Sequence, residues 1–279
     1  MATPEQRALQ RDIIKQLYVG ERFDAAIEIE QRSEFLANYL QSSGSRTLVL
    51  GISGGVDSLV GGCLAQRAVE LCHKRGYEAS FIAMRLPYGE QHDEADAQLS
   101  LQVIQPDETL VVDVQPASDA MLEKCLSAGL PFRDAAQRDF VHGNIKARQR
   151  MIAQFAVAGA RQGLVVGTDH AAEALMGFFT KFGDGAADVM PLTGLNKRRV
   201  RALAQAMGAP QEQVHKVPTA DLESLQPLKP DEIAMGVSYE HIDDFLEGKL
   251  VPDAAYEVIF ATFRRTAHKR ALPAFPVIS

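Results

Sequence analysis

Two stretches near the N-terminus carry apolar residues at the spacing of amphipathic helices. Leu9, Ile13 and Leu17 recur every four positions, and a second apolar stripe runs through residues 23–41. Polar residues fill most positions between them, so one side of each helix is expected to be buried. The pattern predicts a pair of helices within residues 4–42.

After residue 45 the pattern changes, and short apolar runs alternate with segments of helical periodicity. The apolar runs predict strands at 46–52, 78–84, 109–114 and 163–167, with a further short strand near 188–192. The helical segments fall at about 57–75, 91–103, 117–129, 134–161, 171–178 and 197–207. This alternation favours an α/β fold, a Rossmann-like parallel sheet with helices on both faces. Ligands of such sheets bind at the carboxyl ends of the strands.

Residues 218–231 form a polar, proline-containing segment that fits neither a helix nor a strand. Two interpretations stay open, a plain surface connection and a lid over a bound nucleotide. The whole chain, 1–279, is then predicted to be a single domain. Its expected parts are N-terminal helices at 4–42, an α/β core at 46–217, a mobile loop at 218–231 and C-terminal helices at 232–279.

The composition indicates the class of protein, its partners and its cellular compartment. Hydrophobic residues make up 46% of the chain and charged residues 23%, as in ordinary globular proteins, and the net charge of −7 gives no reason to expect a nucleic-acid partner. Cys63, Cys72 and Cys125 are odd in number and form no C-x-x-C pair, which favours a reducing compartment. No apolar stretch reaches the roughly 18 residues of a membrane span, and no signal peptide is evident, so a cytoplasmic location without membrane contact is expected.

The chemistry begins directly after the first predicted strand, at Gly51-Ile52-Ser53-Gly54-Gly55-Val56-Asp57-Ser58. Glycines let the backbone approach an anion closely, and the amides of the following helix start favour a pyrophosphate. Asp57 stands where a phosphate-bound Mg²⁺ would lie. The string lacks the lysine of a Walker A loop and the spacing of a dinucleotide fingerprint. The alternative is a glycine-rich turn in which Asp57 serves only the helix dipole.

A second string, Gly167-Thr168-Asp169-His170-Ala171-Ala172-Glu173, follows the strand predicted at 163–167. If that strand neighbours the first one, Glu173 faces the same crevice as Asp57, and the two carboxylates suit Mg²⁺. The equally open alternative is a capping box with Thr168 or Asp169 as the cap. His170 is interpreted as a structural residue or a ribose-edge contact rather than a base.

Four further strings are weaker signals. The aromatic and glycine residues of 178–188 suit a slot for a flat ring, or a loop packed on the core. The cations at 196–199 open a helix against its dipole, which an anionic ligand would help explain, although a solvated basic face explains them too. The bases at 143–151 and 268–270 could bind phosphate or face solvent.

Read in order, these strings resemble one family, the ammonia-dependent NAD synthetases of the N-type ATP pyrophosphatase superfamily. The resemblance covers most of the chain and rests on GISGGVDS at 51–58, RLPYGEQHDEADAQ at 85–98, GNIKARQRM at 143–151, GTDHAAE at 167–173, FFTKFGDGAAD at 178–188, LNKRRV at 195–200, PTADL at 218–222 and HKR at 268–270. Val56 departs from the pattern, because the family is associated with a polar residue there; backbone amides would still form the cradle.

The resemblance implies an adenine nucleotide alpha-hydrolase-like fold and a role for each motif. Residues 51–58 would hold the ATP pyrophosphate, Asp57 and Glu173 would bind Mg²⁺, and Thr168, Lys197 and Thr219 would contact ATP. The second substrate, deamido-NAD, would be held by Arg148, Lys181, Asp188, His268 and Lys269. Asp57, Glu173, Lys181 and Asp188 would carry the chemistry. Family members are homodimers with active sites near the interface, for which the helix at 134–161 is the candidate here.

The implied reaction, the last step of NAD biosynthesis, forms an acyl-adenylate from ATP and deamido-NAD. Ammonia then displaces AMP, with Asp184 or Asp188 as a conceivable acceptor of the ammonium proton. A glutamine-hydrolysing amidase domain would need a few hundred more residues, so free ammonia is the expected nitrogen source. Two rivals remain: another pyrophosphatase-loop enzyme, such as a tRNA-modifying or GMP-synthetase-like enzyme, and a non-catalytic ATP-binding sensor.

Overall fold

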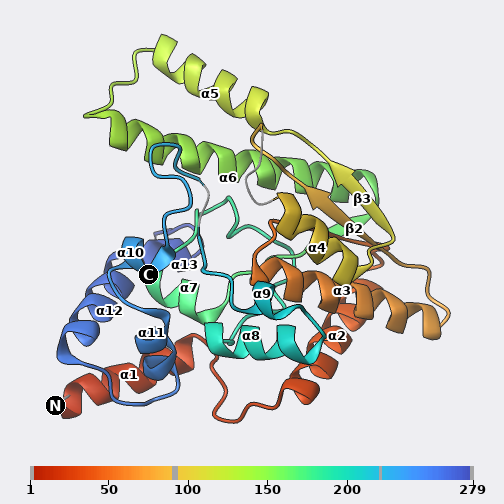
Figure 1. Ribbon diagram of the computed structural model, residues 1–279, viewed down its shortest axis with the longest axis horizontal. Coiled ribbons are helices and arrows are strands. Elements are labelled where there is room, and N and C mark those ends of the chain that lie inside the picture. The colour runs from red at the N-terminus through yellow and green to blue at the C-terminus, as the bar shows by residue number, and fades with distance from the viewer. Residues whose placement is uncertain (1–2, 90–93, 220–221, 277–279) are drawn as a thin grey trace.

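The chain forms a four-stranded parallel sheet, whose strands β2 and β3 are labelled toward the right of Figure 1. The computed structural model describes residues 3–89, 94–219 and 222–276. The strands are β1 (Thr47–Gly51), β2 (Ser80–Arg85), β3 (Glu108–Val111) and β4 (Gly163–Val165), in the order β3-β2-β1-β4. The predicted α/β class and the first four predicted strands are thereby confirmed.

The pairing of β1 with β4 decides where a ligand can bind. Val49 of β1 stands opposite Val165 of β4, while β1 also pairs with β2 on its other side. The chain therefore leaves β1 in one direction along the sheet and returns to its opposite side at β4, which makes a topological switch point between these two strands. The strand predicted near 188–192 is wrong: among the described residues, only an isolated bridge joins Val166 to Val189. A glycine and a proline nearby, Gly194 and Pro191, leave too short a run for a strand.

Helices cover both faces of the sheet (Figure 1). On one face lies α3 (Val56–Lys74), against which α2 (Ala25–Ser42), α4 (Glu94–Ile104) and α8 (Lys197–Ala206) pack. On the other face α6 (Ala135–Ala160) contacts β1 and β4, and α5 (Gln115–Ser127) packs against α6. None of the helices in the described part of the chain is long and apolar enough to cross a membrane.

Both faces of β1 are buried, as expected for a parallel strand covered by helices. Leu48 and Leu50 belong to the core beneath α2 and α3, whereas Val49 belongs to the core beneath α6. Each of these side chains is almost completely buried and contributes roughly 1.5–3 kcal/mol of burial free energy. The sheet is therefore held rigidly at the point where the glycine string leaves β1.

A third hydrophobic cluster lies beside the sheet. It is built by α1 (Pro4–Gln16), α7 (Ala171–Met176), α11 (Tyr239–Leu246) and α12 (Asp253–Arg265). Shorter helices are α9 (Gln211–Val214), α10 (Asp231–Met235) and α13 (Ala267–Arg270). The helix predicted from residue 91 begins at Glu94 in the part described, since 90–93 lie outside it. The three cysteines are free.

Candidate active site

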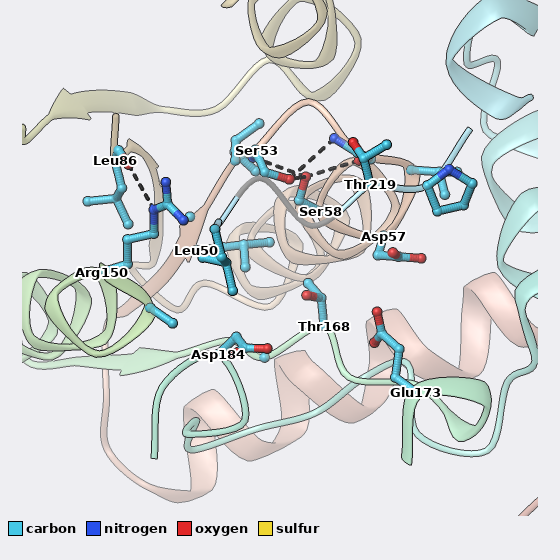
Figure 2. Close-up of a pocket in the computed structure, with 18 of the residues that line it drawn as sticks. Leu50, Ser53, Asp57, Ser58, Leu86, Arg150, Thr168, Glu173, Asp184 and Thr219 are labelled. Atoms are coloured by element: carbon cyan, nitrogen blue, oxygen red, sulfur yellow. Dashed lines mark hydrogen bonds between the residues drawn. The ribbon is translucent and has the colours of Figure 1, made fainter. Parts of the chain in front are cut away.

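The glycine string and the Gly167–Glu173 string lie side by side at the switch point, as their positions after β1 and β4 predict. Both contribute to one pocket, which we call the nucleotide pocket (Figure 2). Its lining includes these predicted residues: Gly51, Ile52, Ser53, Gly55, Val56, Asp57, Ser58, Thr168, Glu173, Lys197 and Thr219. The structure thus brings together the residues expected to hold ATP, with Gly54 behind the lining.

The turn after β1 requires glycine at Gly54 in particular. Its φ of +85° lies in the left-handed region, and a Cβ there would lie 2.8 Å from the backbone nitrogen of Ala97. Ser58 Oγ accepts from the Ser53 amide at 3.2 Å and donates to the Gly55 carbonyl at 3.0 Å, which closes the turn. Because Gly55 caps α3 without a side chain, the first amides of this helix stay available for an anion.

An acidic pair lies beside the turn. Asp57 is in the first turn of α3 and Glu173 in the first turn of α7, and the Glu173 side chain extends toward Asp57 (Figure 2). The ligand atoms of Asp57, His170 and Glu173 all lie within 4.8 Å of one another. The Lys197 ammonium at the start of α8 donates to Asp57 Oδ2 at 2.6 Å.

The pKa values of the two carboxyls are driven apart. Burial alone would raise the pKa of Asp57, but the Lys197 ammonium and His170 outweigh it and hold the pKa below its usual range. Burial raises the pKa of Glu173 to about 8, with repulsion from Asp57 in the same direction and attraction from His170 against it. In the absence of a cation, the site therefore favours the charged form of Asp57 and the neutral form of Glu173.

The donor set fits a divalent cation. Asp57 Oδ1 is buried and makes no well-aligned hydrogen bond among the described residues; its contact with His170 Nε2 is long, at 3.4 Å. A buried carboxylate oxygen with only this weak contact, beside a second carboxyl that resists ionisation, is the environment that a cation would stabilise. The oxygen ligands of Asp57 and Glu173 suit Mg²⁺ in chemistry.

His170 lies beside this pair and caps the helix that carries Glu173. Its Nδ1 accepts from the Glu173 amide at 3.4 Å and caps α7, so the predicted caps Thr168 and Asp169 are wrong. The cap leaves the ring proton on Nε2, which lies 3.4 Å from Asp57 Oδ1 and 3.6 Å from Glu173 Oε2. The structural interpretation of His170 fits this position, since only 1% of the residue is exposed.

The cations that open α8 have acidic or backbone partners. Arg198 forms salt bridges with Asp244 and Glu247, and Arg199 donates to the Gly20 carbonyl. Lys197 is 1% exposed, so a solvated basic face is the wrong description for it. Its ammonium lies in the pocket because burial is offset by the ion pair with Asp57, which raises the pKa of Lys197.

Several pocket residues were not among the predicted site residues. Leu86 follows β2, Arg150 and Gln154 lie four residues apart on α6, and Lys216 follows α9. Arg150 donates to the Leu86 carbonyl at 3.0 Å, and Gln154 accepts from the Gly51 amide at 2.8 Å. Arg150 belongs to the basic string at 143–151, and the helical spacing of Arg150 and Gln154 places both on one face of the predicted helix.

The residues expected to hold the second substrate are found in two places. Arg148, Lys181, His268 and Lys269 form one group, which we call the rim cluster, outside the lining of the nucleotide pocket. Arg148 donates to the Lys181 carbonyl at 3.2 Å, and Lys181 donates to the His268 carbonyl at 2.5 Å. Asp188 lies apart from them, and its carboxylate accepts from the Val165 amide at 2.8 Å.

A second pair of carboxyls lies between the pocket and the rim cluster. The Asp184 side chain lines the pocket and is open to solvent on that side. The protein atoms around it reduce the hydration of its carboxylate, which raises the pKa of Asp184. Burial, together with the Asp184 and Asp57 carboxyls, raises the pKa of Asp169. Burial lowers the pKa of Lys269, against the attraction of the Asp184 and Asp169 carboxyls.

Comparison with known proteins agrees with this geometry. The family model described as NAD synthase matches residues 28–273. An NH(3)-dependent NAD(+) synthetase of Streptomyces coelicolor is 63% identical over 99% of this chain and 100% of its own, and one of Paraburkholderia phytofirmans is 62% identical over 96% and 94%. The crystal structure of an NAD+ synthetase from Burkholderia pseudomallei superimposes with a TM-score of 0.85 at 58% identity, covering 98% of this chain and 100% of its own. The chain belongs to the NAD synthase family.

Proposed function

We propose that this chain catalyses the ATP-dependent amidation of deamido-NAD with free ammonia, giving NAD, AMP and pyrophosphate. The observation that carries the proposal is the glycine turn at the switch point together with the Asp57–Glu173 pair beside it. A turn with exposed amides favours a pyrophosphate, and paired carboxylates favour its cation. The names of relatives that are 62–63% identical over nearly the whole chain point to the same reaction.

In this proposal the 51–58 turn holds the ATP pyrophosphate, while Thr168, Lys197 and Thr219 contact the nucleotide. All of them line the same pocket. Asp57 and Glu173 would hold Mg²⁺, which when bound neutralises phosphate charge and assists the departure of pyrophosphate. Lys197 adds a fixed positive charge beside Asp57.

The proposed chemistry has two displacements. A nicotinate carboxylate oxygen attacks the α-phosphorus, and the bond from that phosphorus to the bridging oxygen breaks as pyrophosphate leaves. Ammonia then attacks the acyl carbon, AMP leaves, and one proton of the former ammonium passes to a base. Asp184 suits this last role better than Asp188, because Asp184 lines the pocket whereas the Asp188 carboxylate accepts from a backbone amide.

The rim cluster is the proposed site of deamido-NAD, since cations grouped at the edge of the pocket suit an anionic dinucleotide. We further propose that two copies pair through α5 and α6 and that the active sites lie near this interface. Phe140 and Ile152 of α6 are 55% and 52% exposed, and Met121 of α5 is 49% exposed, so apolar surface is present there. Sedimentation of the purified protein tests the pairing. Free thiols agree with a cytoplasmic location.

One assay tests the reaction. The purified protein is supplied with ATP, Mg²⁺, deamido-NAD and ammonium, and NAD and pyrophosphate are followed together. We expect one pyrophosphate per NAD, with glutamine giving almost no product in place of ammonium. ATP binding without pyrophosphate release would support a sensor instead, and turnover of xanthosine monophosphate or recovery of bound tRNA would support the other rivals.

A further inference from the structure

We propose that one face of α6 is a latch that holds residues 222–225 closed over the nucleotide pocket. The latch consists of Asp139, Gly143 and Lys146, which follow one another at helical spacing on the face that also carries Arg150 and Gln154. These three are positioning residues, because they act on the segment and not on the reacting atoms. The inference deepens the proposed function and rests on it for the identity of the ligand, ATP.

The segment between α9 and α10 is joined at its two ends. Thr219 forms an antiparallel bridge with Pro230, and the Asp231 amide donates to the Pro218 carbonyl at 3.0 Å. Pro218, Thr219 and Leu222 line the nucleotide pocket. The connection between α9 and α10 reaches toward α6 (Figure 1), and Lys146 of α6 donates to the Leu222 carbonyl. Because Leu222 also lines the pocket, contacts that hold Leu222 against α6 keep it over the pocket.

Two buried charges of α6 hold the backbone of the segment. The Asp139 carboxylate accepts from the Ser224 amide at 2.9 Å through Oδ1 and from the Leu225 amide at 2.7 Å through Oδ2. The Lys146 ammonium donates to the Leu222 carbonyl at 3.1 Å and to Ser224 Oγ at 2.8 Å. Asp139 is 8% exposed and Lys146 is 3% exposed. Buried charges are stable only when hydrogen-bonded, so these contacts favour the closed segment.

Gly143 makes the close approach possible. It lies between the two charged residues, and a Cβ there would stand 3.1 Å from the Cβ and the carbonyl oxygen of Leu222. Glycine weakens a helix interior relative to alanine, so its position here needs a local reason. The passage of the Leu222 backbone over α6 supplies that reason.

Lys146 also contacts the other segment that borders the pocket. Its ammonium lies 4.0 Å from the centre of the Tyr88 ring, and the Tyr88 hydroxyl donates to Asp119 Oδ1 at 2.6 Å. Tyr88 comes two residues after Leu86, which lines the pocket. One buried ammonium therefore links the segments at 86–88 and 222–225.

Gly143→Ala is the sharpest test, because it should strengthen the helix while pushing the segment away. We expect calorimetry to show that ATP binds about tenfold more weakly, because a loss of that size corresponds to the free energy of one to two hydrogen bonds. Hydrogen exchange at the Ser224 and Leu225 amides should become faster, without a fall in Tm. Gly159→Ala is the matched control, since Gly159 lies on the same helix and a Cβ there would enter open space, with no packed neighbour within 4 Å.

Lys146→Met tests the charge, with Lys15→Met on the exposed surface of α1 as its control. The KM for ATP should rise about tenfold with kcat changed less than about threefold, and Lys146→Arg should restore part of the loss. Unchanged ATP affinity and unchanged exchange at Ser224 and Leu225 in both Gly143→Ala and Lys146→Met would overturn the latch. Absence of ATP binding in the unaltered protein would instead refute the proposed function, while the exchange measurement would still decide the latch.

Discussion

The nucleotide pocket and the rim cluster hold their charges in different ways. In the pocket, the buried Lys197 ammonium lies 2.6 Å from Asp57 Oδ2, and His170 lies between Asp57 and Glu173. In the rim cluster, Arg148 and Lys181 donate to backbone carbonyls. A carbonyl satisfies a hydrogen bond but does not cancel a charge, so Arg148 and Lys181 keep their positive charges for a ligand.

This difference indicates which part of the site is organised before a ligand binds. Buried, mutually paired charges in a low-dielectric pocket have little freedom to rearrange, and their geometry is set before a ligand arrives. Charges near the surface are screened and act through attraction and positioning. We therefore expect changes in the pocket to affect turnover and changes at the rim to affect affinity for the second substrate.

Asp57→Asn should have the largest effect on turnover. A small effect would contradict the conclusion that the charges of the nucleotide pocket are organised for turnover. Loss of this carboxylate removes a proposed cation ligand and leaves the Lys197 ammonium unpaired. We expect pyrophosphate release to fall by at least about 100-fold, the order found when a preorganised electrostatic group is removed. Binding of deamido-NAD should change less than about threefold. An equal loss in Asp12→Asn, an exposed carboxylate on α1, would contradict the assignment.

Lys181→Met should have an intermediate effect, confined to the second substrate. The variant keeps the side-chain stem but loses the ammonium that donates to the His268 carbonyl. We expect the KM for deamido-NAD to rise about tenfold, the value of one charge-assisted hydrogen bond, with ATP affinity unchanged. Steady-state kinetics with each substrate varied in turn measures this, and Lys74→Met at the exposed end of α3 is the control. A parallel loss of ATP affinity would show that the two regions are not separate.

The smallest effect concerns stability of the metal-free protein. Folding raises the pKa of Glu173 from 4.5 to about 8. Between these two pH values, Glu173 therefore holds a proton in the folded protein that it has released in the unfolded chain. The contribution of this group is fully present below about pH 4.5 and is lost as pH rises through about 8. The Tm should therefore fall across this window, at roughly 2–4 °C for each kcal/mol, and less steeply in Glu173→Gln. Parallel Tm curves for the two proteins in calorimetry would contradict this.

Local motifs made the centre of the nucleotide pocket predictable. The strings at 51–58 and 167–173 each follow a strand, and the rule for parallel sheets places such strings at one edge. The sequence favours a structural role or a ribose-edge contact for His170. Its role as the cap of α7 depends on a ring tautomer and a backbone angle that the spacing of residues along the chain does not indicate. Leu86 and Gln154 come from distant segments, and only the fold brings them to the pocket.

Asp188 illustrates the opposite case. It belongs to the same string as Lys181, yet its carboxylate turns to the Val165 amide beside the sheet while Lys181 lies in the rim cluster. The loop that joins them passes through Phe182, whose φ is +58°, and the two side chains have different hydrogen-bond partners. The cations of α8 likewise gained partners from α3 and α11 that no local pattern indicated.

By itself, the sequence determined the α/β class, the order of strands and helices, and the glycine turn with its acidic partner, because these depend on periodicity and on residues close together in the chain. The tertiary structure alone decided that β4 lies beside β1, that Lys197 pairs with Asp57, and that α6 contacts residues 222–225. Such contacts join residues many positions apart, and they form only when burial of the shared core supplies the free energy that ordering the chain costs.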